Sequence, residues 1–228
     1  MSVRVVLFDL DNSSHGLVPS EILSPEETRR AEAYRQDLHR FRFQNGRLWL
    51  RYFLAETVNI SPAALNFAEK EGEKPKIFTS GEPLAVSWSL SRSEDLGAVV
   101  IATAGRVGID IEKDRPVPEA SAIASDFFSE EEREALRATS AEGLQGHFLR
   151  LWTAKEALTK AAGLGLSADL SSFTVNCDDP ARPKLTAGEP PFAPEDWHLA
   201  ALCGDAGWVG SLASDQPLGT IRLQDRRA

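Results

Sequence analysis

Long apolar runs and clustered cysteines are both missing from this 228-residue sequence. No apolar run approaches the roughly 20 residues that span a bilayer, and the first residues lack the pattern of a signal peptide. We therefore expect a cytoplasmic protein with no membrane partner. The two cysteines, Cys177 and Cys203, lie 26 positions apart without a CxxC partner, so neither a zinc cluster nor a disulfide framework is indicated.

Basic character and several common catalytic motifs are absent as well. The net charge of −9 argues against a nucleic-acid partner, since backbone binding depends on many cationic contacts, but it is compatible with a phosphate-bearing small ligand. We find no Gly-x-Ser-x-Gly elbow, Walker loop or dinucleotide-binding glycine pattern, and the four histidines show no motif spacing. These absences count against hydrolases of that type and against P-loop enzymes.

Strand and helix patterns occur in two similar series. β-Branched and alternating segments predict strands at Val3–Leu10, Leu84–Ser91, Gly97–Thr103, Val107–Glu112, Phe173–Cys177, Trp197–Cys203 and Trp208–Ala213. Periodicity and capping residues predict helices from Ser24 to about Arg35, over Gly46–Val58, from Ser129 to about Arg137, and from Phe148 to Ala162. We expect an α+β fold of two similar α/β halves, residues 1–105 and 106–228, with a β-meander in the middle of the chain.

Two acids lie two positions apart in the strand predicted at Val107–Glu112. The strand period turns Ile109 and Ile111 to one face and Asp110 and Glu112 to the other. Acids at this spacing lie roughly 6.5 Å apart at their Cα atoms, so both side chains reach one cation. The alternative is a solvated strand edge, where each acid pairs with a nearby Lys or Arg.

A third acid and a lysine lie on the last predicted helix. The i, i+4 spacing stacks Trp152, Glu156 and Lys160 along one face, although an ordinary Glu–Lys helix pair has the same spacing. With Asp110 and Glu112, Glu156 makes an all-oxygen donor set that suits Mg²⁺. Lys160 is then placed to neutralise a phosphate held by the same metal, so a pyrophosphate ligand fits both groups.

These segments carry a resemblance to a known family. Gly108–Glu112, Phe127–Glu132 and Trp152–Lys160 occur in the order and spacing seen in 4′-phosphopantetheinyl transferases, and the chain resembles the long surfactin-synthetase-activating type over nearly its full length. The resemblance implies a monomer, with coenzyme A in a cleft between two halves related by a pseudo-two-fold axis. It also implies Mg²⁺- or Mn²⁺-dependent transfer of 4′-phosphopantetheine to a serine of an apo acyl, polyketide or peptidyl carrier protein, releasing 3′,5′-adenosine bisphosphate.

The resemblance also implies roles for individual residues. Asp110, Glu112 and Glu156 match the metal ligands, and whether Glu156 is also the general base for the serine stays open. The implied catalytic set is Glu156, Lys160 and Asp110. Contacts with the coenzyme are implied for several basic and polar residues: Arg30, Lys74, Ser89, Lys155 and Lys160.

One motif departs from the family pattern. Relatives usually read Asn-(Ile/Leu)-Ser-His-Ser where residues 87–91 read Ser-Trp-Ser-Leu-Ser, so Leu90 replaces the histidine that meets the 3′-phosphate. We therefore expect weaker reliance on that phosphate, with Arg92 as a substitute cation.

Carrier docking has to use local features, because carriers are usually acidic around the modified serine and this chain is acidic too. The candidates are an apolar patch at Phe127 and Phe128 and the loop 114–125, rimmed by Arg115. Two other functions remain open at this stage. One is a metal-dependent nuclease that uses Lys113 beside the acid pair, and the other is a non-catalytic module that binds carriers or coenzyme A.

Overall fold

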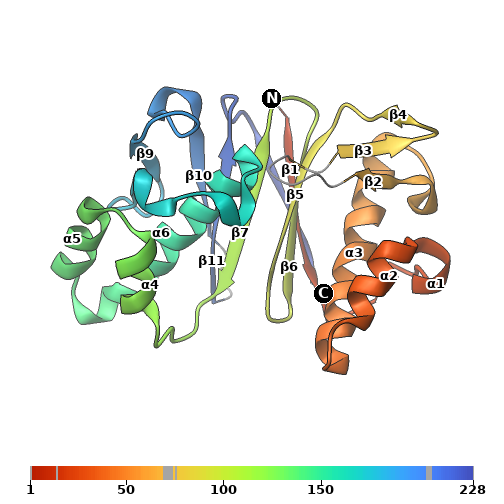
Figure 1. The fold of residues 1–228 in the computed structure, drawn as a ribbon, viewed down its shortest axis with the longest axis horizontal. Helices are drawn as coiled ribbons and strands as arrows, with labels where there is room; N and C mark the ends of the chain where they lie inside the picture. Colours follow the sequence, from red (N-terminus) through yellow and green to blue (C-terminus); the bar gives the residue numbers. More distant parts are fainter. Residues whose placement is uncertain (1, 14, 69–73, 75, 204–206, 228) are drawn as a thin grey trace.

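The computed structural model describes residues 2–13, 15–68, 74, 76–203 and 207–227. Its helices are α1 (Pro19–Ile22), α2 (Pro25–Glu32), α3 (Asp37–Val58), α4 (Ala120–Phe127), α5 (Glu130–Ala138) and α6 (Ala141–Ala162). Its strands are β1 (Val3–Asp9), β2 (Asn66–Ala68), β3 (Lys76–Thr79), β4 (Glu82–Pro83), β5 (Ser87–Ser93), β6 (Leu96–Ala102), β7 (Val107–Lys113), β8 (Thr174–Asn176), β9 (Lys184–Ala187), β10 (His198–Cys203), β11 (Trp208–Ser214) and β12 (Ile221–Arg226). Figure 1 shows the longer strands in the middle of the molecule, with α1–α3 on one side and α4–α6 on the other.

Two sheets organise the middle of the molecule. The first has the order β12-β1-β6-β5, and the second has the order β10-β11-β7. The β-meander predicted from the sequence is wrong, because β7 leaves the β5–β6 hairpin and pairs with β11 instead. This placement lets β7 bury Ile109 and Ile111 between the two sheets.

The two sheets share one strand order, with β1-β6-β5 in the first and β7-β11-β10 in the second. In each half, a first strand is followed by helices and then by further strands. The prediction of a mixed α+β fold is confirmed. The expected boundary at residue 105 falls in the turn between β6 and β7, but β12 returns to pair with β1 in the first sheet.

Two of the helices named above, α2 and α5, begin where capping signals indicate. Ser24 with Glu27 and Ser129 with Glu132 form the capping boxes that start α2 and α5, as predicted. Helix α3 begins well before its predicted start at Gly46. None of the helices in the described residues is both long and apolar enough to cross a membrane.

Apolar side chains stack these elements in the order α3, first sheet, second sheet, α6 (Figure 1). On β1, Phe8 faces α3, whereas Val5 faces the second sheet and packs in one cluster with Ile109. Ala213 of β11 packs on the α6 side. Because β1 is buried on both faces, its sequence is almost continuously apolar. The edge strands β5 and β7 lie next to each other where the two sheets meet.

Candidate functional site

Strand β7 presents its two acids as the strand period predicts. Ile109 and Ile111 are fully buried in the cluster between the sheets, so Asp110 and Glu112 lie on the opposite face, toward α6. Asp110 is only 5% exposed. The alternative of a solvated strand edge is therefore wrong for this acid.

Helix α6 lies directly on β7 because Gly108 has no side chain. A Cβ on Gly108 would stand 2.1 Å from the carbonyl oxygen of Ala157 and 2.4 Å from the amide nitrogen of Ala161. No other residue permits this separation between strand and helix. The close approach brings Glu156 and Lys160 of α6 to the acids of β7.

Lys160 links α6 to both edge strands. Its Nζ donates to Asp110 Oδ1 at 2.6 Å and to Ser91 Oγ at 3.3 Å. The Lys160 side chain is 28% exposed and that of Asp110 is 6% exposed, so the ammonium reaches a buried acid from the solvent side. Lys160 thus pairs with Asp110 of β7. The alternative of an ordinary Glu–Lys pair on the helix surface does not describe this lysine.

Two serines of β5 contact the acids of β7. Ser91 donates its hydroxyl to Asp110 Oδ1 at 2.7 Å, and Ser93 donates to Glu112 Oε2 at 2.6 Å. Sequence reasoning missed both contacts. The signal available in the sequence is the alternation of serine at positions 87, 89, 91 and 93.

The acids influence one another electrostatically. Burial raises the pKa of Glu112; the Ser93 hydroxyl opposes this rise and the charge of Asp110 adds to it. Burial also raises the pKa of Glu156, where Lys160 opposes the rise and both β7 acids add to it. A cation bound among these carboxylates would relieve their mutual repulsion.

The donor set fits a hard metal ion. Asp110 Oδ2 is buried and has no hydrogen-bond partner within the described residues, which leaves its lone pairs available. The three acids offer only carboxylate oxygens, the ligand type that Mg²⁺ prefers. In the part of the chain that the structure describes, no three Asp, Glu, His or Cys side chains are already gathered closely enough to hold an ion. The three acids lie near one another, but their carboxylates do not converge on a single point.

Two of the predicted coenzyme contacts meet at one aromatic ring. Arg30 of α2 and Arg92 of β5 place their guanidinium carbons 5.9 Å and 5.3 Å from the centre of the Phe43 ring. Both arginines are exposed. Two cations held over one ring at the surface form a site that suits an anionic ligand.

Lys74 lies where the two sheets meet. Its Nζ donates to the Trp88 carbonyl oxygen of β5 at 2.7 Å and to the Val107 carbonyl oxygen of β7. The pKa of Lys74 is lowered to about 7, mainly by burial; the charges of Arg106 and Lys160 contribute to the lowering, and the charge of Asp215 opposes it. This ammonium is therefore close to its titration midpoint at neutral pH.

Successive side chains of β5 point to opposite faces of the strand, which separates Ser89 from Leu90. Ser89 is 6% exposed and shares the face of Ser91 and Ser93. Leu90 is on the other face and packs with the apolar cluster around α3. The predicted effect of Leu90 on the use of the 3′-phosphate stays a prediction.

Comparison with known proteins identifies the family. The model of the 4′-phosphopantetheinyl transferase superfamily matches residues 106–212. The 4′-phosphopantetheinyl transferase HetI of Nostoc sp. is 31% identical over 191 residues, which cover 84% of this chain and 78% of HetI. The chain belongs to the 4′-phosphopantetheinyl transferase superfamily. The resemblance stated from the sequence motifs is confirmed.

Other relatives of this transferase-family chain align over shorter parts. The 4′-phosphopantetheinyl transferase Sfp of Bacillus subtilis is 30% identical over 157 residues, which cover 67% of this chain and 66% of Sfp. The Synechocystis sp. relative slr0495 is 33% identical over 150 residues, which cover 66% of this chain. That alignment spans only 61% of the length of slr0495.

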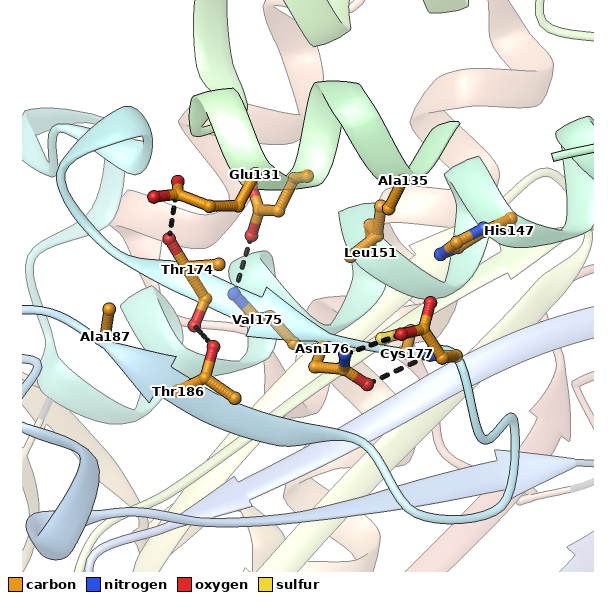
Figure 2. Close-up of a pocket in the computed structure, with 12 residues that line it drawn as sticks. Glu131, Ala135, His147, Leu151, Thr174, Val175, Asn176, Cys177, Thr186 and Ala187 are labelled. Atoms are coloured by element: carbon orange, nitrogen blue, oxygen red, sulfur yellow. Dashed lines mark hydrogen bonds between the residues drawn. The ribbon is translucent and has the colours of Figure 1, made fainter. Parts of the chain in front are cut away.

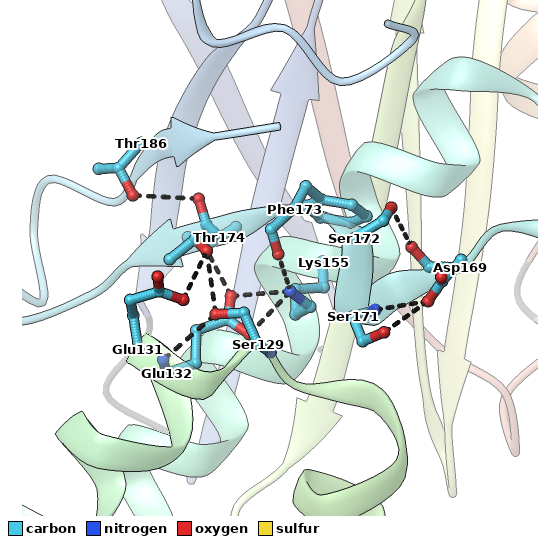
Figure 3. A network of polar contacts seen from close by, with 11 residues as sticks. Ser129, Glu131, Glu132, Lys155, Asp169, Ser171, Ser172, Phe173, Thr174 and Thr186 are labelled. Carbon is cyan, nitrogen blue, oxygen red and sulfur yellow. Dashed lines mark hydrogen bonds and ion pairs between the residues drawn. The ribbon is translucent and has the colours of Figure 1, made fainter. Parts of the chain in front are cut away.

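The Lys155 side chain is occupied by contacts within the protein. Its side chain is fully buried, and its Nζ donates to Glu132 Oε1 at 2.7 Å, to Glu132 Oε2 at 2.8 Å and to the Phe173 carbonyl oxygen at 2.7 Å (Figure 3). These contacts use the full donor capacity of the ammonium. The prediction that Lys155 binds the coenzyme is therefore wrong, and its role is to neutralise the acid of the capping box that starts α5.

Lys113 is also directed away from the acid pair. Its Nζ lies 2.9 Å from Asp95 Oδ1 in the turn between β5 and β6. A nuclease of the acid-x-Lys type would need this ammonium beside Asp110 and Glu112. The contact with Asp95, together with membership of the transferase superfamily, counts against the nuclease alternative.

A separate cavity of about 180 Å³ lies between α5, α6 and the β8–β9 hairpin (Figure 2). Glu131, His147 and Cys177 are among the residues that line it. Burial lowers the pKa of His147 and raises the pKa of the Cys177 thiol to about 12, so both are neutral at pH 7. None of the predicted site residues lines this cavity, which sets it apart from the acids of β7.

Proposed function

We propose that this chain transfers 4′-phosphopantetheine from coenzyme A to a serine of an apo carrier protein and releases 3′,5′-adenosine bisphosphate. The observation that carries the proposal is the junction of Lys160, Asp110 and Ser91, which brings a phosphate-neutralising cation and a metal-binding acid together from three elements. Membership of the superfamily supports the reaction class.

Asp110, Glu112 and Glu156 would hold the Mg²⁺ ion, with Mn²⁺ as the alternative metal. Two observations support this assignment: Asp110 Oδ2 has no hydrogen-bond partner among the described residues, and the neighbouring acids repel the charges of Glu112 and Glu156, a repulsion that a bound cation would relieve. The bound ion would supply charge neutralisation at the pyrophosphate of the coenzyme.

Glu156 would accept a proton, and Lys160 would neutralise negative charge. Because burial raises its pKa, the Glu156 carboxylate is a better proton acceptor for the carrier serine than a solvated glutamate is. The metal-ligand and base roles of Glu156 remain alternatives in this proposal. Lys160, one turn further along α6, would neutralise the phosphate that leaves with the adenosine.

The coenzyme would lie along the line where the two sheets meet. Lys74 bonds to β5 and β7 at that line, Ser89 belongs to β5, and Arg30 and Arg92 over Phe43 would add two cations. The shared strand order of the two sheets supports a pseudo-two-fold relation between residues 1–105 and 106–228, with the ligand cleft between them.

The carrier would dock beside Glu156 on α6. Trp152 lies one turn before Glu156, and Phe127 packs edge-on against it at 6.1 Å between ring centres. Phe127 is 41% exposed, while Phe128 is buried and cannot serve as the exposed docking aromatic that the sequence indicated. The segment 114–125, expected to be a loop, includes the first part of α4, and Arg115 pairs with Glu94 at 3.2 Å.

The assay mixes the protein with coenzyme A, Mg²⁺ and apo carriers of the fatty-acid, polyketide and peptide classes, and measures the intact mass of each carrier. The proposal predicts a gain of one phosphopantetheine on at least one carrier. No gain on any carrier, from protein that binds coenzyme A, would favour the non-catalytic binding module instead. The monomeric state, the cytoplasmic location and the absence of nucleic-acid and membrane partners stay predictions.

A further inference from the structure

Serine hydroxyls of β5 bond to backbone amides of β7 where the two sheets meet. Three β7 amides donate to hydroxyl oxygens at 3.2, 3.2 and 3.0 Å, and the pairs are Val107 with Ser87, Ile111 with Ser91, and Lys113 with Ser93. In every pair the two residues are 20 positions apart, so the strands run parallel and in constant register. The hydroxyls thus fix the register of β7 against β5.

Ser91 and Ser93 do more than join the strands. Each accepts from the amide of one β7 residue and donates its own proton to the carboxylate of the preceding residue, which is Asp110 for Ser91 and Glu112 for Ser93. Ser87 accepts from its amide in the same way, and its partner Val107 is not preceded by an acid. Of the three serines that accept a β7 amide, Ser91 and Ser93 make the additional contact and Ser87 does not.

A serine hydroxyl has a single proton, so its direction is determined once its acceptor is chosen. The β7 amide holds the hydroxyl oxygen in place, and the hydroxyl proton then points at the carboxylate in a defined direction. Ser91 and Ser93 are 4% and 6% exposed, which limits competition from water for these bonds. On Asp110, the bond occupies Oδ1 and leaves the buried Oδ2 without a partner among the described residues.

We propose that Ser91 and Ser93 are positioning residues that orient the Asp110 and Glu112 carboxylates for the metal ion. The inference rests on the proposed function, because it assumes that these acids bind the metal. An acid that is already oriented loses less conformational freedom when the ion binds. Residues that hydrogen-bond to metal ligands typically contribute about 10- to 100-fold to the affinity for the metal.

The test uses pairs of variants that differ by one hydroxyl. Ser93→Thr keeps the hydroxyl, whereas Ser93→Val replaces it with a methyl of similar shape, and β-branched residues suit a strand. Ser87→Thr and Ser87→Val form the matched control, and Ser91→Ala is a second variant next to Asp110. Binding of Mn²⁺ to each protein without coenzyme is followed by the loss of the free-ion electron paramagnetic resonance signal, and urea unfolding monitors the fold.

The proposal predicts that Ser93→Val and Ser91→Ala weaken Mn²⁺ binding by about 10-fold or more. Ser93→Thr and both Ser87 variants should stay within about threefold of the unmodified protein, a smaller change than the loss of such a partner causes. Equal binding by Ser93→Val and Ser93→Thr would overturn the proposal. An equal loss in Ser87→Val would also overturn it, because the hydroxyls would then serve only to join the sheets. If the unmodified protein itself binds no Mn²⁺, the proposed metal site fails and this inference fails with it. If the unmodified protein binds Mn²⁺ and Ser93→Val binds it equally well, only this inference fails.

Discussion

Lys160 and Asp110 lie 50 positions apart in the sequence and are joined by a 2.6 Å ion pair between α6 and β7. Replacing Lys160 by Met should lower kcat/KM for coenzyme A by about 100-fold, because the cation at the leaving phosphate is lost. Steady-state kinetics checks this. Lys113→Met is the matched control, since Lys113 pairs with Asp95 and should leave the activity close to normal. Normal kcat/KM in Lys160→Met would show that this ammonium is not part of the transfer site.

Gly108→Ala should destabilise the protein strongly. The new Cβ would meet the Ala157 carbonyl oxygen at 2.1 Å, so α6 must move off β7, and we expect a loss of about 3 kcal/mol or more in the free energy of unfolding. Gly146→Ala within α6 is the control, because its Cβ meets only the flexible end of Arg150, at 3.2 Å. Urea denaturation measures both variants. Similar unfolding midpoints for the two would contradict the close packing of α6 on β7.

Lys155→Met should affect stability rather than coenzyme binding. It leaves the buried Glu132 carboxylate without its cation, which costs about 3 to 5 kcal/mol. The double variant Lys155→Met/Glu132→Gln should recover part of this loss. KM for coenzyme A should stay unchanged in any variant that folds, and a tenfold rise without loss of stability would restore Lys155 as a ligand contact.

Coenzyme binding should take up protons above neutral pH. Lys74 has a pKa lowered to about 7, so it is mostly neutral at pH 8, and a nearby phosphate would raise that pKa. Binding at pH 8 should then draw in up to about one proton per coenzyme, and affinity should fall as the pH rises above 7. Calorimetry in buffers of different ionisation enthalpy measures the uptake. The proposed contact would be excluded if Lys74→Met took up as many protons as the unmodified protein.

The local features of the candidate site were predictable from the sequence. The period of two placed Asp110 and Glu112 on one face of β7, and the period of 3.6 placed Glu156 and Lys160 one turn apart on α6. The two capping boxes were predictable too, since each involves residues only three positions apart. Short-range backbone geometry determines all of these features.

Contacts between distant segments were not predictable in the same way. The pairing of β7 with β11, the return of β12 to the first sheet and the bonds from Ser91 and Ser93 all depend on how the sheets pack. Lys155 was misassigned for this reason, because adjacent positions on a helix point about 100° apart and only the fold shows that Glu132 lies beside it.

The most direct test of the account is the intact mass of an apo carrier treated with this protein and coenzyme A, before and after the metal is removed. We predict a gain of one phosphopantetheine with Mg²⁺, no gain with a chelator, and recovery when Mg²⁺ is restored. Asp110→Asn should give no gain within the same time under any of these conditions. Modification at the normal rate in the chelator, or by Asp110→Asn with Mg²⁺, would contradict the assignment of the transfer site to the acids of β7.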